Sequence, residues 1–289
     1  MRTRIISGAV LTVLLVGAVA GGGITMFILA AFITGMGLFE LYRVVGIHNK
    51  ALGITGYVLS AGFYAMLWFD KLNYLDYFCV AAGILFMFVY VCTFKTMRAK
   101  QAAFGILGIF YVAIPISYIY RIRIMENGIF IFILVFVCSW IADTCAYFTG
   151  VTLGKHKLCP HLSPKKSVEG AIGGILGATI IGTIYGLVLG NYINETLAPA
   201  FAIICAAGSF ISIFGDLAAS AIKRNYDVKD YSNLIPGHGG ILDRFDSMIF
   251  VAPIVYTGAA LLIPILLKRL DYEENIYFRV YRFEWDSDT

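Results

Sequence analysis

Charge is scarce in this sequence. Only 14% of the 289 residues are charged, whereas about a quarter of the residues in a soluble domain carry charge. Hydrophobic residues make up 60% of the chain, and the mean hydropathy is +0.82. A domain linker, a low-complexity tract and a sequence repeat are also missing. This composition excludes a soluble globular protein and predicts a polytopic membrane protein.

Paired cysteines and zinc-type ligand spacings are absent as well. The six cysteines stand singly, five of them within apolar runs, and no Cys-x-x-Cys or Cys/His ligand spacing occurs. We therefore expect reduced cysteines that pack against their neighbours. Neither a zinc site nor a disulfide framework is expected.

Nine apolar segments are each close to the length that crosses a bilayer. The apolar pattern resumes directly after the glycines at 21–23, so we interpret the first segment as an uncleaved span rather than a secretory signal peptide. The glycines predict a tight hairpin between the first two spans. The fold class is therefore all-α, a polytopic integral membrane protein with about nine transmembrane helices. The segments cover about residues 5–20, 24–42, 51–69, 74–94, 102–120, 127–150, 168–190, 197–222 and 247–267.

Basic residues concentrate in alternate loops, where 15 of the 22 lysines and arginines lie on one side. By the positive-inside rule, the amino terminus and the charged loops face the cytoplasm of a cell (inner) membrane, and an odd number of spans places the tail outside. The aromatic tail segment at 276–285 is expected at the membrane interface. We expect a single transmembrane domain over 1–289, with N-terminal spans in 1–125, catalytic spans in 126–267, cytoplasmic loops at 151–167 and 223–246, and a C-terminal tail at 268–289.

The most highly charged stretch is Ser220–Asp246, which lies between two apolar segments. Its centre, Pro-Gly-His-Gly-Gly at 236–240, cannot continue a helix and frees backbone N–H groups that could point at an anion. Asp243, Arg244 and Asp246 come next, and they offer oxygen ligands for a cation and a guanidinium for phosphate. Such charge beside a membrane span is costly. The stretch therefore predicts phosphoryl chemistry at a membrane surface.

This stretch resembles the signature of the phosphatidate cytidylyltransferases, also called CDP-diacylglycerol synthases. The shared pattern is Ser-x-apolar-Lys-Arg, four residues, Lys-Asp, and then Pro-Gly-His-Gly-Gly-apolar-x-Asp-Arg-apolar-Asp, and every defining position is present. A second, less specific block is similar to another recurrent block of that family: Asp-x-x-Ala-Tyr-x-x-Gly at 143–150 and Ser-Pro-Lys-Lys-Ser-x-Glu-Gly at 163–170. The resemblance implies that phosphatidate and CTP are joined to give CDP-diacylglycerol and pyrophosphate.

Acidic residues within the predicted spans need partners, and Asp143 and Asp216 are the two that stand out. For Asp143 a structural salt bridge and a binding role are equally compatible with the sequence. Neither Asp216 nor Asp243 has an obvious neutralising partner beside it, and a divalent cation would supply that charge. We therefore expect Mg²⁺ at Asp216 and Asp243, with room for a second cation.

The basic residues of both loops are expected to hold phosphates. The expected catalytic residues are Lys223, Arg224, Arg244 and Asp246, and Asp246 either ligates a second cation or holds a clamp residue. For His238 we favour a phosphate-binding or loop-shaping role over a general base, because the substrate phosphate is already ionised. The expected substrate-binding residues are Asp143, Lys165, Lys166, Ser220, Lys229, Gly237, His238, Gly239 and Gly240.

Two other functions stay open at this point. A CTP-dependent lipid kinase of the polyprenol type would need a base near a hydroxyl group. A transporter is disfavoured, because the polar residues cluster at one face and no inverted repeat of interrupted spans is visible. We expect CTP and phosphatidate as substrates, the lipid bilayer as environment and no nucleic acid partner. Similar proteins suggest a homodimer.

Overall fold

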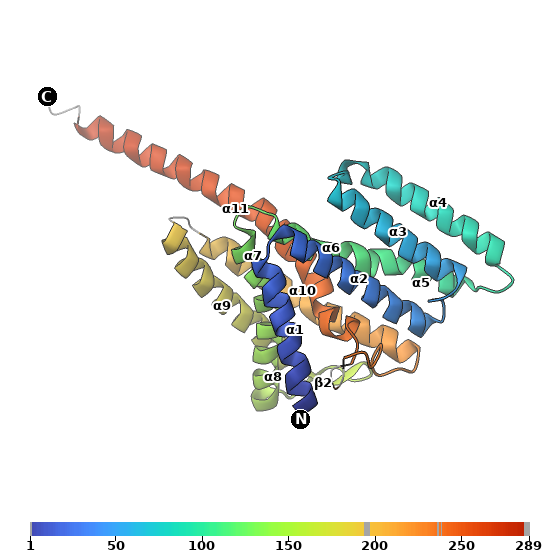
Figure 1. Ribbon diagram of the computed structural model, residues 1–289. Helices are drawn as coiled ribbons and strands as arrows, with labels where there is room; N and C mark the ends of the chain where they lie inside the picture. Colours follow the sequence, from blue (N-terminus) through green and yellow to red (C-terminus); the bar gives the residue numbers. More distant parts are fainter. Residues whose placement is uncertain (1, 194–196, 236, 238, 286–289) are drawn as a thin grey trace.

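The computed structural model describes residues 2–193, 197–235, 237 and 239–285, and Figure 1 shows their arrangement. For residues 2–7, 9–11, 192–193 and 266–285 it describes the backbone alone. The elements are α1 (Arg2–Ala20), α2 (Gly23–Val45), α3 (Ala51–Trp68), η1 (Leu72–Tyr74), α4 (Leu75–Thr93), α5 (Ala99–Gly108), η2 (Ile109–Ala113), α6 (Ile114–Arg123), α7 (Gly128–Phe136), η3 (Val137–Ile141), α8 (Ala142–Leu153), β1 (Lys157–Cys159), β2 (Ser163–Ser167), α9 (Val168–Ile193), α10 (Ala198–Asn225) and α11 (Leu242–Trp285).

The all-α membrane fold is confirmed. Across the described ranges, eight helices are long and apolar enough to cross a membrane, and they correspond to the second to ninth predicted segments. The largest difference is at the last span, expected to begin at 247 and found to begin at Leu242. The first predicted segment is helix α1, which is not among the eight. Helix α11 continues through the tail to Trp285. The predicted aromatic belt depends on side chains of this tail, which lie outside the described residues, so it stays a prediction.

The predicted hairpin between the first two helices is present. Helix α1 ends at Ala20 and α2 begins at Gly23, and Gly22 between them has φ 92°. Glycine adopts this positive φ without the steric cost that a side chain adds. The Thr25 hydroxyl donates a hydrogen bond to the Ala18 carbonyl (2.7 Å), which fastens the two helices at the turn.

Alternating spans place four connections on one side of the molecule, the side on which α1 begins (Figure 1). We call it the loop side. Among these connections is a two-stranded antiparallel hairpin, β1–β2, which carries Lys165 and Lys166. Glu169 in the first turn of α9 fixes the hairpin base, because its carboxylate contacts His156 Nδ1 (2.6 Å) and accepts the Lys155 and His156 backbone N–H groups. The charged hairpin is therefore anchored to the beginning of α9.

Close helix packing on α9 depends on small residues. A side chain at Gly173 would meet Thr149 of α8 at 2.2 Å, and one at Gly182 would meet Cys205 of α10 at 2.3 Å. Glycine therefore lets α8 and α10 approach opposite parts of α9. Helix α11 packs on α10 and also on α2 and α6, so the N-terminal spans contact the charged region directly.

Two spans contain a π-helical turn. Segment η2 interrupts the span Ala99–Arg123, and η3 interrupts the span Gly128–Leu153. A π turn inserts one extra residue and rotates the part of the helix after it, and such turns are frequent at functional sites. Segment η3 ends two residues before Asp143, so it sets the direction in which that carboxylate leaves the helix.

Candidate active site

A polar cavity of about 760 Å³ lies on the loop side, between the ends of α8, α10 and α11 and the β1–β2 hairpin. It brings together residues that the sequence separates by as many as a hundred positions. Those expected from the sequence and found in its wall are Asp143, Lys165, Lys166, Asp216, Lys223, Asp243, Arg244 and Asp246. Ser220, Arg224, Lys229, Gly237, Gly239 and Gly240 are not in its wall, and His238 lies outside the described residues.

A second, apolar cavity of about 870 Å³ adjoins the polar one. Its walls come from α1, α2, the η3–α8 segment and the beginning of α11. Apolar side chains such as Val13, Ile28 and Phe32 line most of it. The two cavities share the residues Asp143, Asp243, Arg244, Asp246 and Ser247. A charged wall therefore separates a polar chamber from an apolar one.

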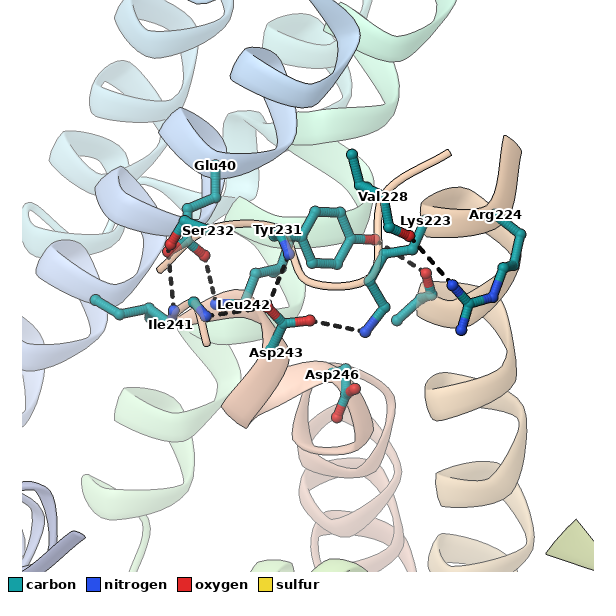
Figure 2. Close-up of polar contacts among 12 residues, drawn as sticks. Glu40, Lys223, Arg224, Val228, Tyr231, Ser232, Ile241, Leu242, Asp243 and Asp246 are labelled. Carbon is teal, nitrogen blue, oxygen red and sulfur yellow. Dashed lines mark hydrogen bonds and ion pairs between the residues drawn. The ribbon is translucent and has the colours of Figure 1, made fainter. Parts of the chain in front are cut away.

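Asp243 fastens the charged loop between α10 and α11 (Figure 2). One carboxylate oxygen accepts a hydrogen bond from Lys223 Nζ (2.7 Å), and the other accepts the backbone N–H groups of Tyr231 (2.8 Å) and Gly240 (3.0 Å). The Asp243 side chain is only 3% exposed. Each oxygen is therefore engaged by a donor from this chain, and ligation of a metal by Asp243 would have to replace one of these bonds.

Asp216 also has a basic partner, because its carboxylate forms an ion pair with Lys166 of the hairpin. The expectation that Asp216 and Asp243 lack neutralising partners is therefore wrong. Lys166 and Lys223 supply the positive charge, and both side chains are partly or largely buried. The sequence conceals the first pairing, since 50 residues and the whole of α9 separate Lys166 from Asp216.

Asp246 differs from these two carboxylates. Its Oδ1 accepts the neighbouring Ser247 N–H (2.8 Å), and the Ser247 hydroxyl lies at the 3.5 Å limit. In the described part of the chain no ion pair reaches Asp246, and no hydrogen bond reaches its Oδ2. The Asp246 carboxylate, which lines both cavities, therefore has an oxygen available for a ligand.

The donor set fits a hard divalent cation completed by substrate. Within the described residues no group of three or more His, Cys, Asp or Glu side chains forms a metal cage. Mg²⁺, however, is commonly bound by one or two carboxylates together with substrate phosphates. Asp216 and Asp246 line the same cavity, and each carries an oxygen that makes no ion pair or hydrogen bond with the described residues.

The glycine-rich loop uses its backbone differently from the expectation. Gly237 and Gly239 have φ of 79° and 83°, in the left-handed region that favours glycine. The Gly240 N–H, however, donates to Asp243 of this chain, so it is not free for a phosphate. Arg224 at the end of α10 donates to the Val228 carbonyl (3.4 Å). Phosphate binding by the other loop N–H groups, by Arg224 and by Lys229 stays a prediction.

Two residues that reasoning from the sequence missed complete this region. Glu40 of α2 is 1% exposed and bonds to the charged loop, although only Asp143 and Asp216 stood out from the sequence as acidic residues within spans. A glutamate inside the predicted span 24–42 is a visible signal, since such residues are costly unless they serve a purpose. Tyr231 is 1% exposed, and burial raises the pKa of its hydroxyl, so it stays a hydrogen-bond donor to the Ala219 carbonyl (3.4 Å).

Comparisons with known proteins identify the family. Residues 2–262 match the model of the cytidylyltransferase family. The phosphatidate cytidylyltransferase of Bacillus subtilis (strain 168) is 35% identical, with 90% of this chain and 98% of that protein covered. Proteins of the same name from Staphylococcus haemolyticus and Staphylococcus saprophyticus are 31% and 30% identical, each with 88% of this chain and 97% of its own length covered. The chain belongs to the cytidylyltransferase family.

Proposed function

We propose that this protein transfers the cytidylyl group of CTP to phosphatidate, which gives CDP-diacylglycerol and pyrophosphate. The observation that carries the proposal is the charged wall shared by the polar and the apolar cavity. A reaction between a water-soluble nucleotide and a lipid phosphate needs one chamber for each, with the reacting groups at the boundary. The names of the relatives support this assignment.

The polar cavity suits the triphosphate. Lys165, Lys166, Lys223 and Arg244 line it, and their charges favour phosphate oxygens. The apolar cavity suits the acyl chains, which would enter sideways between α1 and the helices behind it.

A phosphate oxygen of phosphatidate attacks the α-phosphorus of CTP in line, the bond to the β-phosphate breaks, and pyrophosphate leaves with the electron pair.

Positioning and charge stabilisation are the work left to the protein, because the lipid phosphate is an ionised nucleophile and needs no base. When bound, Mg²⁺ would neutralise charge on the phosphate oxygens. Asp216 and Asp246 are the residues that would hold it, and Asp143 lines the same wall. Asp243 holds Lys223 and the loop in place, as its bonds indicate. Room for a second cation stays a prediction.

Location and assembly belong to the same proposal. We expect the loop side to be cytoplasmic, because CTP is a cytoplasmic metabolite and basic residues concentrate there. The relatives are bacterial, which fits the cell membrane of such an organism. The homodimer suggested by similar proteins stays a prediction.

The decisive experiment incubates purified protein with phosphatidate, Mg²⁺ and CTP labelled at the α- or the γ-phosphate. We expect the α-label to appear in lipid and pyrophosphate to be released. Transfer of the γ-label to lipid would instead establish the kinase alternative. Movement of substrate into sealed vesicles without release of pyrophosphate would establish a transporter.

A further inference from the structure

Glu40 joins the N-terminal spans to the charged loop. Its Oε1 accepts the Ser232 hydroxyl (2.5 Å) and the Ile241 N–H (2.9 Å), and its Oε2 accepts the Leu242 N–H (2.7 Å). Figure 2 shows these bonds above the first turn of α11. Glu40 is only 1% exposed, so its carboxylate is bonded by these three donors of the protein instead of by water.

The bonds fall where α11 needs them. The first N–H groups of a helix have no partner within the helix, and their combined dipole favours a negative charge. Helix α11 begins at Leu242, and Glu40 accepts the N–H groups at this end from a different helix. Glu40 therefore acts as an N-cap supplied from α2, 202 residues away in the sequence.

The turn before α11 lies between two carboxylates. The Gly240 N–H donates to Asp243, while a side chain at Gly240 would lie 2.6 Å from the Glu40 carboxylate. Only glycine lets Glu40 approach the backbone this closely. Ser232, which donates to Glu40, also accepts the Leu234 N–H (3.1 Å) and so folds the other end of the turn.

We propose that Glu40 is a positioning residue for the reaction. It fixes the start of α11, and with it the direction in which Asp243 and Asp246 leave the first turn of that helix. The inference rests on the proposed function, because Asp246 matters only if the shared wall is the reaction site. Helix α2 also lines the apolar cavity through Ile28 and Phe32, so one rigid helix sets both the lipid chamber and the loop.

The test compares Glu40→Gln and Ser232→Ala with a matched control, Thr34→Val. Gln keeps the shape of Glu40 but removes the charge and sets an NH₂ group against one of the three donors. Thr34 lies on the same helix and is also buried, and its hydroxyl is 2.6 Å from the Tyr64 hydroxyl, away from the loop. Two readouts are needed: kcat and KM for pyrophosphate release, and amide hydrogen exchange of the peptide covering residues 231–244.

For Glu40→Gln we expect kcat to fall by about tenfold or more, with KM for CTP and phosphatidate within about threefold of wild type. Exchange of the 231–244 peptide should rise by roughly tenfold while the remaining peptides keep their protection. Ser232→Ala should shift both quantities in the same direction by about threefold. Thr34→Val should leave kcat and the exchange of that peptide unchanged.

The proposal would be overturned if Glu40→Gln and Ser232→Ala both keep the wild-type kcat and the wild-type amide exchange of the 231–244 peptide. A fall of kcat in Thr34→Val as large as that in Glu40→Gln, with exchange rising throughout the chain, would also overturn it, because it would show a general loss of stability. If Glu40→Gln does not fold, Ser232→Ala decides by the same criteria. If wild-type protein releases no pyrophosphate, the proposed function fails, and the exchange data still decide whether Glu40 holds the loop.

Discussion

Asp243 and Asp246 are one turn apart in α11, and we predict that they respond in opposite ways to loss of charge. Asp243→Asn removes the ion-pair partner of Lys223 Nζ, whose side chain is 12% exposed, and it sets an amide donor against other donors. Removing one partner of a buried ion pair costs about 3–5 kcal/mol. This variant should therefore unfold at a temperature lower by about 10 °C.

Asp246→Asn should instead leave stability unchanged or raise it. The bond from the Ser247 N–H can go to the amide oxygen, and an unpaired negative charge is removed from a wall that also holds Asp143 and Asp216. Pyrophosphate release should fall by about a hundredfold or more and recover in part at high Mg²⁺ or Mn²⁺.

The assay measures unfolding temperature and the Mg²⁺ dependence of pyrophosphate release on the same preparations. Asp227→Asn serves as the control, because Asp227 is exposed and lies outside both cavities. A stable Asp243→Asn enzyme rescued by Mg²⁺, beside an unstable Asp246→Asn, would reverse the two roles. It would return the metal to Asp243, as expected from the sequence alone.

Three further predictions concern the cavities and the loop side. Gly17 lines the apolar cavity, and a Cβ added there meets nothing within 4 Å. Gly17→Phe should therefore displace several methylene groups of the acyl chains, at about 0.8 kcal/mol each, and raise KM for phosphatidate by about a hundredfold. Gly83→Phe on α4, where a Cβ also meets nothing within 4 Å, should leave this KM unchanged. An unchanged KM for phosphatidate would remove the acyl chains from this cavity. Lys166→Met removes the ion-pair partner of Asp216 and should tighten Mn²⁺ binding to the substrate-free protein by about threefold to tenfold, while KM for CTP rises. Electron paramagnetic resonance measures the Mn²⁺ binding, and weaker binding would contradict the assignment of Asp216. Cysteines placed at 166 and 229 should react with an impermeant thiol reagent only after the cytoplasmic face is opened, and labelling of one of them from outside would break the topology.

The membrane fold could be predicted because its signal is local. Each apolar segment reports its own length, and the glycines at 21–23 mark a turn by their own conformational freedom. Three signature residues, Asp243, Arg244 and Asp246, could also be predicted to lie together, because they share one helical turn. All three line the polar cavity. Sequence order was sufficient to predict the structure wherever residues that are neighbours in the chain are also neighbours in space.

The pairing of charges could not be predicted, because it depends on contacts between distant segments. Lys166 reaches Asp216 only because α10 runs back along α9 toward the hairpin, and no spacing rule in the sequence predicts that contact. The π turn at Val137–Ile141, before Asp143, was not predicted either. Asp243 resembles a free ligand in the sequence, but the folded loop occupies both of its oxygens.

The distance between Glu40 and Ser232 has a consequence for biosynthesis. Synthesis of the 192 residues that separate them takes about 10–40 s at about 5–20 residues per second. During that interval α2 is already made, but the Glu40 carboxylate still lacks the donors that it bonds in the finished protein. A charge without partners in a span is costly. The N-terminal spans therefore cannot settle fully around α2 until the loop arrives. A nascent chain that stops short of Ser232 is expected to keep Glu40 at the membrane surface, where quality-control proteases can distinguish it from the finished protein.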